Sequence, residues 1–200
     1  MDENPRLSIK PAKEGDELEL AGDDVSHLRI LQERWERMAD GRGLLLVAWC
    51  DDVAVGHIYL WWEPADEPEL RERLANVPLL MNLWVRKDRR EQGIGTALVH
   101  EAENQLRARA HRRVALGVEL DNRVAIKFYL GRNYYPWPHA DLKTHYDEFK
   151  ADGSHVIGEE VCAVYLKNLG FLHIFRHQLR AVVRRFAKND DASVLTAEPA

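Results

Sequence analysis

Cysteine is scarce in this sequence, and a long hydrophobic run is missing. Of its 200 residues only two are cysteines, Cys50 and Cys162, and both stand in apolar, strand-like stretches. No C-x-x-C pair is present, so we expect buried free thiols in a reducing compartment. No apolar stretch approaches the roughly 18 residues of a membrane span, and the polar, acidic N-terminal residues are unlike a signal peptide. These absences predict a cytoplasmic protein with no metal site and no membrane partner.

An excess of positive charge is also missing. The chain has 28 Lys and Arg against 33 Asp and Glu, which gives a formal net charge of −5. A chain of this charge is no general polyanion binder, so we expect no nucleic-acid partner. Its 46% apolar and 30% charged residues are ordinary for a soluble globular protein. The length fits one domain with a buried core.

The spacing of apolar residues predicts a mixed α/β domain of layered strands and helices. Strands are expected at residues 6–10, 44–50, 53–62, 78–85, 113–120, 141–149 and 156–167. Helices are expected at residues 25–39, 94–110 and 122–133. Asp24 is the expected N-cap of the first helix, and Gly41 its stop. The dipeptides at 51–52 and 152–153 are the expected hairpin turns, and residues 63–72 are expected to be an acidic connection.

Two glycines stand between an apolar strand and a long helix. The segment "RREQGIGTALVHEAENQL" (89–106) places Gly93 and Gly95 where the helix is expected to begin. Open N–H groups and the dipole at a helix start bind anions, and glycine lets the backbone approach them. A dinucleotide fingerprint needs a small residue where Leu98 stands, and no G-x-x-x-x-G-K-[ST] run exists. A phosphate-binding turn and a plain tight turn with solvated arginines both remain open on the glycines alone.

The run R-x-x-G-x-G, from Arg90 to Gly95, resembles the acetyl-CoA-binding motif of the Gcn5-related N-acetyltransferase (GNAT) family. A second segment, "LGVELDNRVAIKFYLGRNYY", is similar to that family's strand-then-helix segment. Its recurring positions are occupied here by Asn122, Ala125, Phe128 and Tyr129. Together the matched region covers about residues 78–135.

One position departs from the family pattern. Asn133 and Tyr134 stand where the family usually has Gly-Phe. Asparagine tolerates a left-handed helix terminus best after glycine, so we expect the turn to survive. The resemblance therefore implies a GNAT domain over residues 1–168, with a central mixed sheet whose two splayed parallel strands are flanked by helices.

The resemblance also implies acetyl-CoA as cosubstrate, lying between strands 79–85 and 114–120. The pantetheine arm is then expected along Leu83, Trp84 and Val85. The pyrophosphate is expected at the turn, which comprises Arg90, Glu91, Gln92, Gly93, Ile94, Gly95, Thr96 and Ala97. On the other strand and its helix the family positions are Asn122, Ala125 and Tyr129. Asn122 is equally suited to be the N-cap of that helix.

For catalysis, the resemblance implies that Tyr129 protonates the leaving thiolate. A tyrosine packed on its helix is the alternative. Glu119 is the expected general base, with Glu63 and His57 as further candidates, although His57 fits a core histidine better. The implied acceptor is a primary amine of a small molecule, such as an antibiotic, polyamine or amino-acid derivative. A protein N-terminus or lysine, and a non-catalytic acyl-CoA-binding domain, are the alternatives.

Residues 169–188 extend beyond the family core. Five of their large apolar residues fall on one helical stripe: Phe171, Phe175, Leu179, Val182 and Phe186. We expect an amphipathic helix that docks on protein, in a homodimer, because leaving this stripe in water favours aggregation. A basic helix of this kind touching membrane or nucleic acid is the alternative. Residues 189–200 are expected to be a disordered tail.

Overall fold

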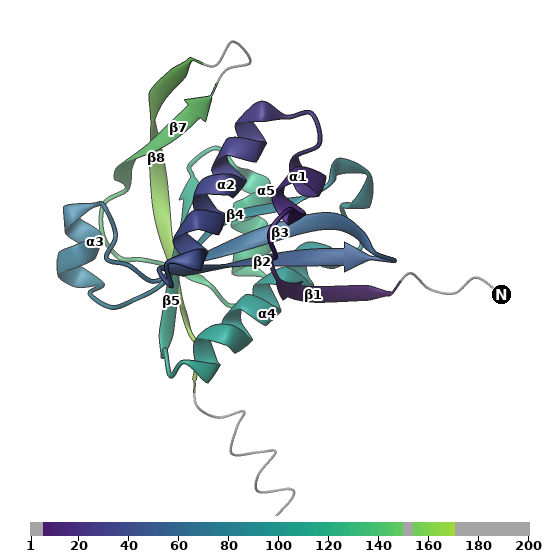
Figure 1. Cartoon of the computed structure of the whole chain (residues 1–200). Coiled ribbons are helices and arrows are strands. Elements are labelled where there is room, and N and C mark those ends of the chain that lie inside the picture. Colours follow the sequence, from purple (N-terminus) through teal and green to yellow (C-terminus); the bar gives the residue numbers. More distant parts are fainter. Residues whose placement is uncertain (1–5, 150–153, 171–200) are drawn as a thin grey trace, which may run out of the picture. The chain divides into compact units, whose positions relative to one another are not determined.

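A mixed eight-stranded sheet organises the described part of the chain (Figure 1). The computed structural model describes residues 6–149 and 154–170. The strand order is β1-β2-β3-β4-β5-β8-β6, and β7 pairs with the other end of β8. The strands are β1 (Leu7–Pro11), β2 (Gly43–Cys50), β3 (Val53–Trp61), β4 (Leu79–Val85), β5 (Arg113–Glu119), β6 (Tyr135–Pro136), β7 (Leu142–Phe149) and β8 (His155–Asn168).

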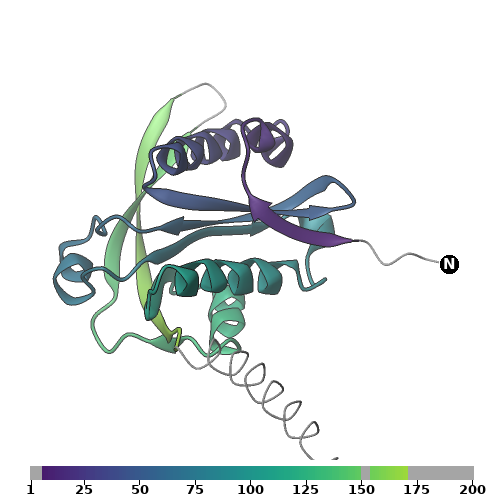
Figure 2. The same cartoon turned by 60° about the horizontal axis from the view of Figure 1, so that its bottom comes forward.

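Helices cover both faces of this sheet (Figure 2). One face carries α1 (Asp16–Ala21) and α2 (Val25–Ala39), and the opposite face carries α4 (Ile94–Ala108) and α5 (Arg123–Leu130). A short α3 (Pro68–Arg73) and a 3-10 turn, η1 (Lys87–Arg89), lie in the connections on either side of β4. The Asp24 side chain caps α2 by accepting the N–H of His27 at 3.0 Å, as predicted.

Side chains alternate along the strands, so both faces of the sheet carry a core, and a third buried cluster forms around α3, Trp137 and β8. In β3, Val55, Ile58 and Leu60 join the core under α4 and α5. Tyr59 and Trp61 instead join the core under α1 and α2. Because both faces are covered, β2 and β3 are apolar almost throughout, which is why they read as continuous hydrophobic runs.

The parallel pair β4 and β5 is joined at one residue pair only. Leu79 is in register with Ala115, whose N–H donates to the carbonyl of Pro78 at 3.0 Å. Beyond this junction the two strands separate toward their carboxyl ends. On the other edge of β4, Asn82 and Leu83 stand together opposite Ile58, and Asn82 has a φ of 52°. This bulge bends β4 away from β5, so the splayed parallel strands are confirmed.

Four short elements were not predicted: α1, α3, η1 and β6. Helices of six residues are too short to show a hydrophobic period, and α3 begins with Pro68 inside the stretch interpreted as a connection. The expected turn at 152–153, the expected helical extension over 169–188 apart from its first two residues, and the tail at 189–200 lie outside the described residues. Among the helices of residues 6–149 and 154–170, none has the length and apolar character to cross a membrane.

Candidate active site

The glycine turn ends at a helix start whose N–H groups are open. Gly93 is the N-cap of α4 and has a φ of 81°, a conformation that favours glycine. The first intrahelical bond runs from the N–H of Ala97 to the carbonyl of Gly93, at 3.0 Å. The N–H groups of Ile94, Gly95 and Thr96 therefore have no intrahelical acceptor. Together with the helix dipole, they form an arrangement suited to an anion.

The Arg90 side chain is hydrogen-bonded to the strand that precedes the turn. Its Nε donates to the carbonyl of Val85, the last residue of β4, at 3.0 Å. The Gln92 amide donates to the carbonyl of Asp88 at 3.3 Å. Among the predicted turn residues 90–97, only Ile94 is buried, so its backbone alone is available to a ligand. The predicted turn residues are thus brought together at the end of β4.

The three predicted β4 residues divide between the two faces. Leu83 and Val85 pack toward the core under α4 and α5. Trp84 faces α2, and its ring stacks on His57 with 5.6 Å between ring centroids. Because β4 pairs with β5 only at Leu79, its inner edge beyond that point has no strand partner. The Arg86 N–H donates to the carbonyl of Val55 on β3, so by alternation the backbone groups of Leu83 and Val85 are the ones that face the split.

Tyr129 lies on α5 and packs in the core between this helix and β5. It is 8% exposed, and its ring makes edge contacts with Phe128 and Tyr134 at centroid distances of 5.1 and 5.3 Å. Burial raises the pKa of the Tyr129 phenol, so it is protonated at neutral pH. No hydrogen bond to this hydroxyl is found among the described residues. A protonated phenol can donate a proton, and a residue with a packing role alone would not need the hydroxyl group.

The helix that carries Tyr129 is fixed at both ends. At its start the Asn122 side chain accepts the N–H of Ala125 at 3.0 Å, so Asn122 is the N-cap. After its end Asn133 has a φ of 64°, which confirms the left-handed terminus expected without glycine. Tyr134 then donates to the buried Glu103 at 3.1 Å. These contacts set the position of Tyr129 against β5.

Glu119 lies on the opposite face of β5 from Tyr129. Val114, Leu116 and Val118 share the core with Tyr129, so alternation turns Glu119 toward the α2 face. There its carboxyl group hydrogen-bonds to that of Glu160 on β8. This hydrogen bond, and repulsion by the second carboxylate, raise the pKa of Glu119. The carboxyl group of Glu160 also accepts the hydroxyl of Thr144 at 3.1 Å.

The other two candidates for the general base are engaged elsewhere. Glu63 forms an ion pair with Arg37 at 2.7 Å. His57 is 2% exposed, and its Nε2 lies 2.7 Å from Nε2 of His27. Burial, and then the neighbouring His27, lower the pKa of His57 to about 3. His57 is thus a neutral core histidine. Within the described ranges, no group of three or more His, Cys, Asp or Glu is placed to hold a metal ion.

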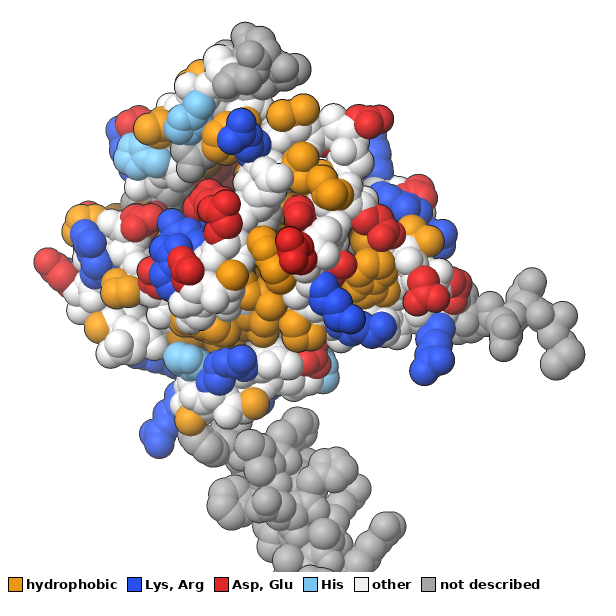
Figure 3. Space-filling model, in the orientation of Figure 1, with side chains coloured by type: hydrophobic (Ala, Val, Ile, Leu, Met, Phe, Trp, Pro, Cys, Tyr) orange, Lys and Arg blue, Asp and Glu red, His pale blue; other side chains and the backbone are white. Residues whose placement is uncertain are grey.

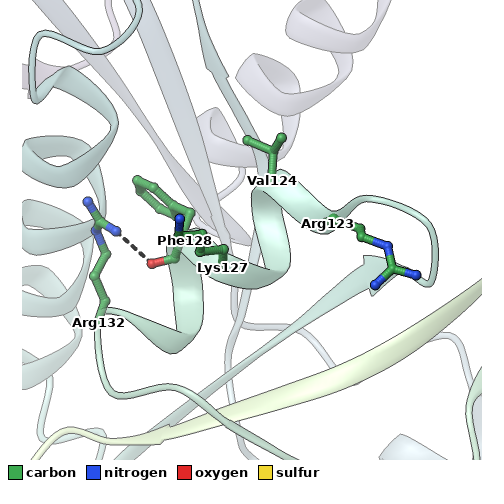
Figure 4. Close-up of a pocket in the computed structure, with 5 residues that line it drawn as sticks. All are labelled: Arg123, Val124, Lys127, Phe128 and Arg132. Atoms are coloured by element: carbon green, nitrogen blue, oxygen red, sulfur yellow. Dashed lines mark hydrogen bonds between the residues drawn. The ribbon is translucent and has the colours of Figure 1, made fainter.

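Two hollows flank the start of α4. One is lined by Arg123, Val124, Lys127, Phe128 and Arg132 and has a volume of about 530 Å³ (Figure 4). The other, of about 590 Å³, lies between β1 and α4 and includes Gly93 and Glu101. On the α2 face, acidic and basic side chains are interspersed with apolar ones (Figure 3). That surface has no large area in which all the charges have the same sign.

Sequence reasoning missed three features of this site: Glu160 beside Glu119, the basic residues at 123, 127 and 132, and the bulge at Asn82. The first depends on the register of β5 against β8, which aligns Glu119 with Cys162. The second depends on how α5 packs beside α4. Only the third feature could have been suspected from the sequence, because Asn82 is a lone polar residue in an apolar strand.

Comparisons with known proteins agree with this geometry. The model of a family described as acetyltransferase (GNAT) family matches residues 12–134. A comparison with curated proteins gave no match.

Solved structures share the fold at low sequence identity. An N-acetyltransferase from Staphylococcus aureus Mu50 is 16% identical, with a TM-score of 0.59 over 82% of this chain and 99% of that one. The ribosomal-protein-S18-alanine N-acetyltransferase of Escherichia coli is 15% identical, with a TM-score of 0.60 over 83% and 96%. PaiA N-acetyltransferase of Thermoplasma acidophilum, solved with coenzyme A, is 17% identical, with a TM-score of 0.55 over 82% and 99%.

Proposed function

The chain belongs to the GNAT acetyltransferase family, and from that membership we propose that it transfers the acetyl group of acetyl-CoA to a primary amine. The observation that carries the proposal is the split between β4 and β5, which are joined only at Leu79 and Ala115. The split opens toward the glycine turn at one end of β4. Structures of this fold have been solved with coenzyme A or acetyl-CoA bound, which supports the same cosubstrate here.

In this proposal the coenzyme binds along the part of β4 that has no hydrogen-bonded neighbouring strand on its inner edge. The pantetheine arm lies along the inner edge of β4 at Leu83, Trp84 and Val85. The pyrophosphate lies on the open N–H groups at the start of α4, where residues 90–97 surround it. Asn122 and Ala125 border the arm from the α5 side. The inner edge of β4 has no strand partner beyond Leu79, and the N–H groups of residues 94–96 have no intrahelical acceptor, so both can bind the coenzyme.

The split passes through the sheet, so a thioester held in it can be reached from both faces. The amine approaches from the α2 face, and its nitrogen lone pair attacks the thioester carbonyl carbon. The C=O electron pair moves to the oxygen, and a backbone N–H of β4 stabilises the resulting oxyanion. The C–S bond then breaks as the carbonyl re-forms. The thiolate takes the phenol proton of Tyr129 on the α5 face, the nitrogen loses its remaining extra proton to solvent, and a proton from solvent restores the Tyr129 phenol.

The ammonium proton of the acceptor must leave before attack, and we assign its removal to Glu119. The residue faces the side from which the amine approaches, and its carboxyl group is solvent-accessible. Because Glu160 raises the pKa of Glu119, the Glu119 carboxylate is a stronger base than an isolated one. Glu119 and Tyr129 thus act on opposite faces of one sheet, one as base and the other as acid.

The acceptor we propose is a small molecule: an antibiotic, a polyamine or an amino-acid derivative. One end of the α2 face is bridged, because the Ser26 hydroxyl donates to the carbonyl of Phe149 at the end of β7. Arg29 of α2 lies over the Phe149 ring, 5.8 Å from its centroid. A bridge between α2 and β7 favours a short acceptor over a long polypeptide. The carboxyl groups of Glu119 and Glu160 favour a cationic one.

The test is thiol release from acetyl-CoA over a panel of amines. The panel contains aminoglycosides, polyamines, amino-acid amides and short peptides with free N-termini, each with a no-amine control. We expect release with at least one small amine, and none with the peptides. Release with a peptide alone would move the acceptor to a protein N-terminus or lysine. Acetyl-CoA binding without release for any amine would leave a non-catalytic acyl-CoA-binding domain.

A further inference from the structure

Asn82 is an exposed polar residue in the middle of β4, the strand that borders the split. Its φ of 52° is uncommon for a residue other than glycine, and it coincides with the bulge opposite Ile58. Backbone conformations of this kind persist only where the surrounding structure holds them, and they are frequent at functional sites. The bulge therefore marks Asn82 as a candidate for a functional role.

Arg34 of α2 sets the direction in which the Asn82 amide points. The Nε of Arg34 lies 3.2 Å from Oδ1 of Asn82, and because an arginine only donates, it is the amide oxygen that turns toward it. Arg34 is held in place: its guanidinium lies over the rings of Tyr59 and Trp61, and its Nη1 donates to Glu33 at 3.1 Å. The Nδ2 group of Asn82 is thus turned away from Arg34. Within residues 6–149 and 154–170 this group has no hydrogen-bond acceptor.

Asn82 and the proposed base stand at a similar level on the two sides of the split. Asn82 lies three residues beyond Leu79 and Glu119 lies four residues beyond Ala115, and the strands are joined at this pair. Asn82 is on the α2 face because its side chain reaches Arg34. Alternation along β5 turns Glu119 toward the same face. A hydrogen-bond donor on β4 and a carboxyl group on β5 therefore flank the split where the amine approaches.

These two groups suit an amine that carries an oxygen close to its nitrogen. Glu119 accepts from the ammonium group, whereas the Nδ2 group of Asn82 needs an oxygen to which it can donate. The guanidinium of Arg34 beside it favours an oxygen with negative charge, as in a carbonyl or carboxylate group. A polyamine has no oxygen, so it would leave the Asn82 amide hydrogens without a partner when bound.

We propose that Asn82 selects the acceptor by donating from Nδ2 to a carbonyl or carboxylate oxygen next to the carbon that bears the amine. The acceptor is then an α-amino acid or an α-amino amide rather than a polyamine. Arg34 is a positioning residue, because it acts through the Asn82 amide. The inference rests on the proposed acetyl transfer and narrows the chemical class of its acceptor.

The test compares amines that differ by one carboxamide group. Phenylalaninamide is paired with phenethylamine, leucinamide with isoamylamine, and lysinamide with cadaverine. Thiol release at saturating acetyl-CoA gives kcat/KM for each, and the ratio of amide to plain amine is compared between proteins, so that the intrinsic reactivity of each amine cancels. In Asn82→Gly this ratio should fall about tenfold, mainly through a higher KM for the amide, because one hydrogen bond is lost.

Three further variants sharpen the test. Asn82→Asp keeps the oxygen that faces Arg34 and loses the donor, so its ratio should fall at least as far. Arg34→Met frees the Asn82 amide to rotate and should lower the ratio partway, which a loss of stability alone would not do. Asn76→Gly is the matched control. Asn76 is also exposed and has a φ of 61°, but it lies in the connection between α3 and β4, so the ratio should stay as it is.

The outcomes separate this inference from the proposed function. Glycine adopts a positive φ without strain, so Asn82→Gly should keep the circular dichroism and the acetyl-CoA affinity of the native chain. A ratio that is unchanged in this variant, or an equal loss for both members of each pair, overturns the role of Asn82 and leaves acetyl transfer standing. A native chain that releases thiol with no amine at all overturns acetyl transfer and this inference with it.

Discussion

Among single residues, two neighbouring tyrosines show how burial and hydrogen bonding separate a chemical role from a structural one. Tyr129 and Tyr134 lie in ring contact, and burial raises the pKa of both phenols. The Tyr134 hydroxyl donates to Glu103, a 3% exposed carboxylate that also binds Arg107 and Lys167. Tyr134 therefore belongs to a structural network, whereas the Tyr129 hydroxyl is available to a ligand.

Replacing each tyrosine by phenylalanine separates these roles. Tyr129→Phe should lower kcat by about a hundredfold, within the range of acid–base contributions, with little change in acetyl-CoA affinity. Tyr134→Phe should leave kcat unchanged and lower the free energy of unfolding by about 1 kcal/mol, because the buried Glu103 loses one of its three donors. Steady-state kinetics and urea unfolding measure the two effects. Normal turnover in Tyr129→Phe would return that residue to a packing role.

The carboxyl pair gives a pH prediction. Since Glu160 raises the pKa of Glu119, activity should rise with pH through an apparent pKa above that of an ordinary carboxylate. Glu160→Gln removes the repelling charge, so the pKa of Glu119 falls and the rise in kcat/KM should move to lower pH. Glu119→Gln should abolish the rise along with most of the activity. An identical pH profile in Glu160→Gln would contradict the coupling.

Between helix and strand, a histidine pair helps to dock α2 on the sheet. His27 on α2 and His57 on β3 share one hydrogen bond, and the ring of Trp84 packs against both. Burial holds the pKa of His57 at about 3, well below its ordinary value of 6.5. The unfolded chain therefore binds a proton below about pH 6.5 that the folded chain does not.

It follows that stability should fall as pH is lowered through the window from 6.5 to 3. The loss attributable to His57 is roughly 2 kcal/mol between pH 7 and pH 5, from about 1.4 kcal/mol for each pH unit. His57→Gln keeps an amide donor facing His27 and removes the titrating group. Urea unfolding at the two pH values should show a smaller pH effect in this variant. Equal pH effects in both proteins would mean that His57 is protonated when folded.

The helices and strands that the sequence predicted are the ones long enough to show a period. The helix at 25–39 has its predicted bounds, and β2 and β3 follow from their apolar runs. The helices α1 and α3 have six residues each, so propensity and spacing carried no signal. In the site, residues 90–97 and Tyr129 came from local motifs. Glu160 and Arg132 could not, because their neighbours depend on how β8 and α5 pack.

For the whole molecule, the boundary between the domain and its C-terminal extension can be placed from contacts. The sequence suggested a domain that ends at residue 168. Leu169 is nevertheless 3% exposed, its N–H donates to the carbonyl of Arg112, and its carbonyl accepts Nε of Arg107. These contacts tie Leu169 to the domain, so a truncation should follow Gly170.

A truncation at that point tests the proposed dimer. We expect the full chain to be a homodimer by light scattering, because the predicted helix over 169–188 carries five large apolar residues on one stripe. A chain that ends at Gly170 should be monomeric, or should aggregate if the covering is needed within one chain. Its acetyl-CoA affinity should match that of the full chain where it stays soluble. A full chain that is strictly monomeric would exclude the dimer.

The single junction between β4 and β5 also bears on cooperativity. An ordinary sheet transmits order from strand to strand through a ladder of hydrogen bonds, but here the ladder is interrupted after Leu79 and Ala115. The strands β1–β4 and β5–β8 therefore form two half-sheets that are joined by one residue pair. Amide protons along their inner edges should exchange quickly in the free protein and slowly once acetyl-CoA bridges the gap. In the proposed reaction cycle, each release of coenzyme A would uncouple the half-sheets, and each new acetyl-CoA would couple them again.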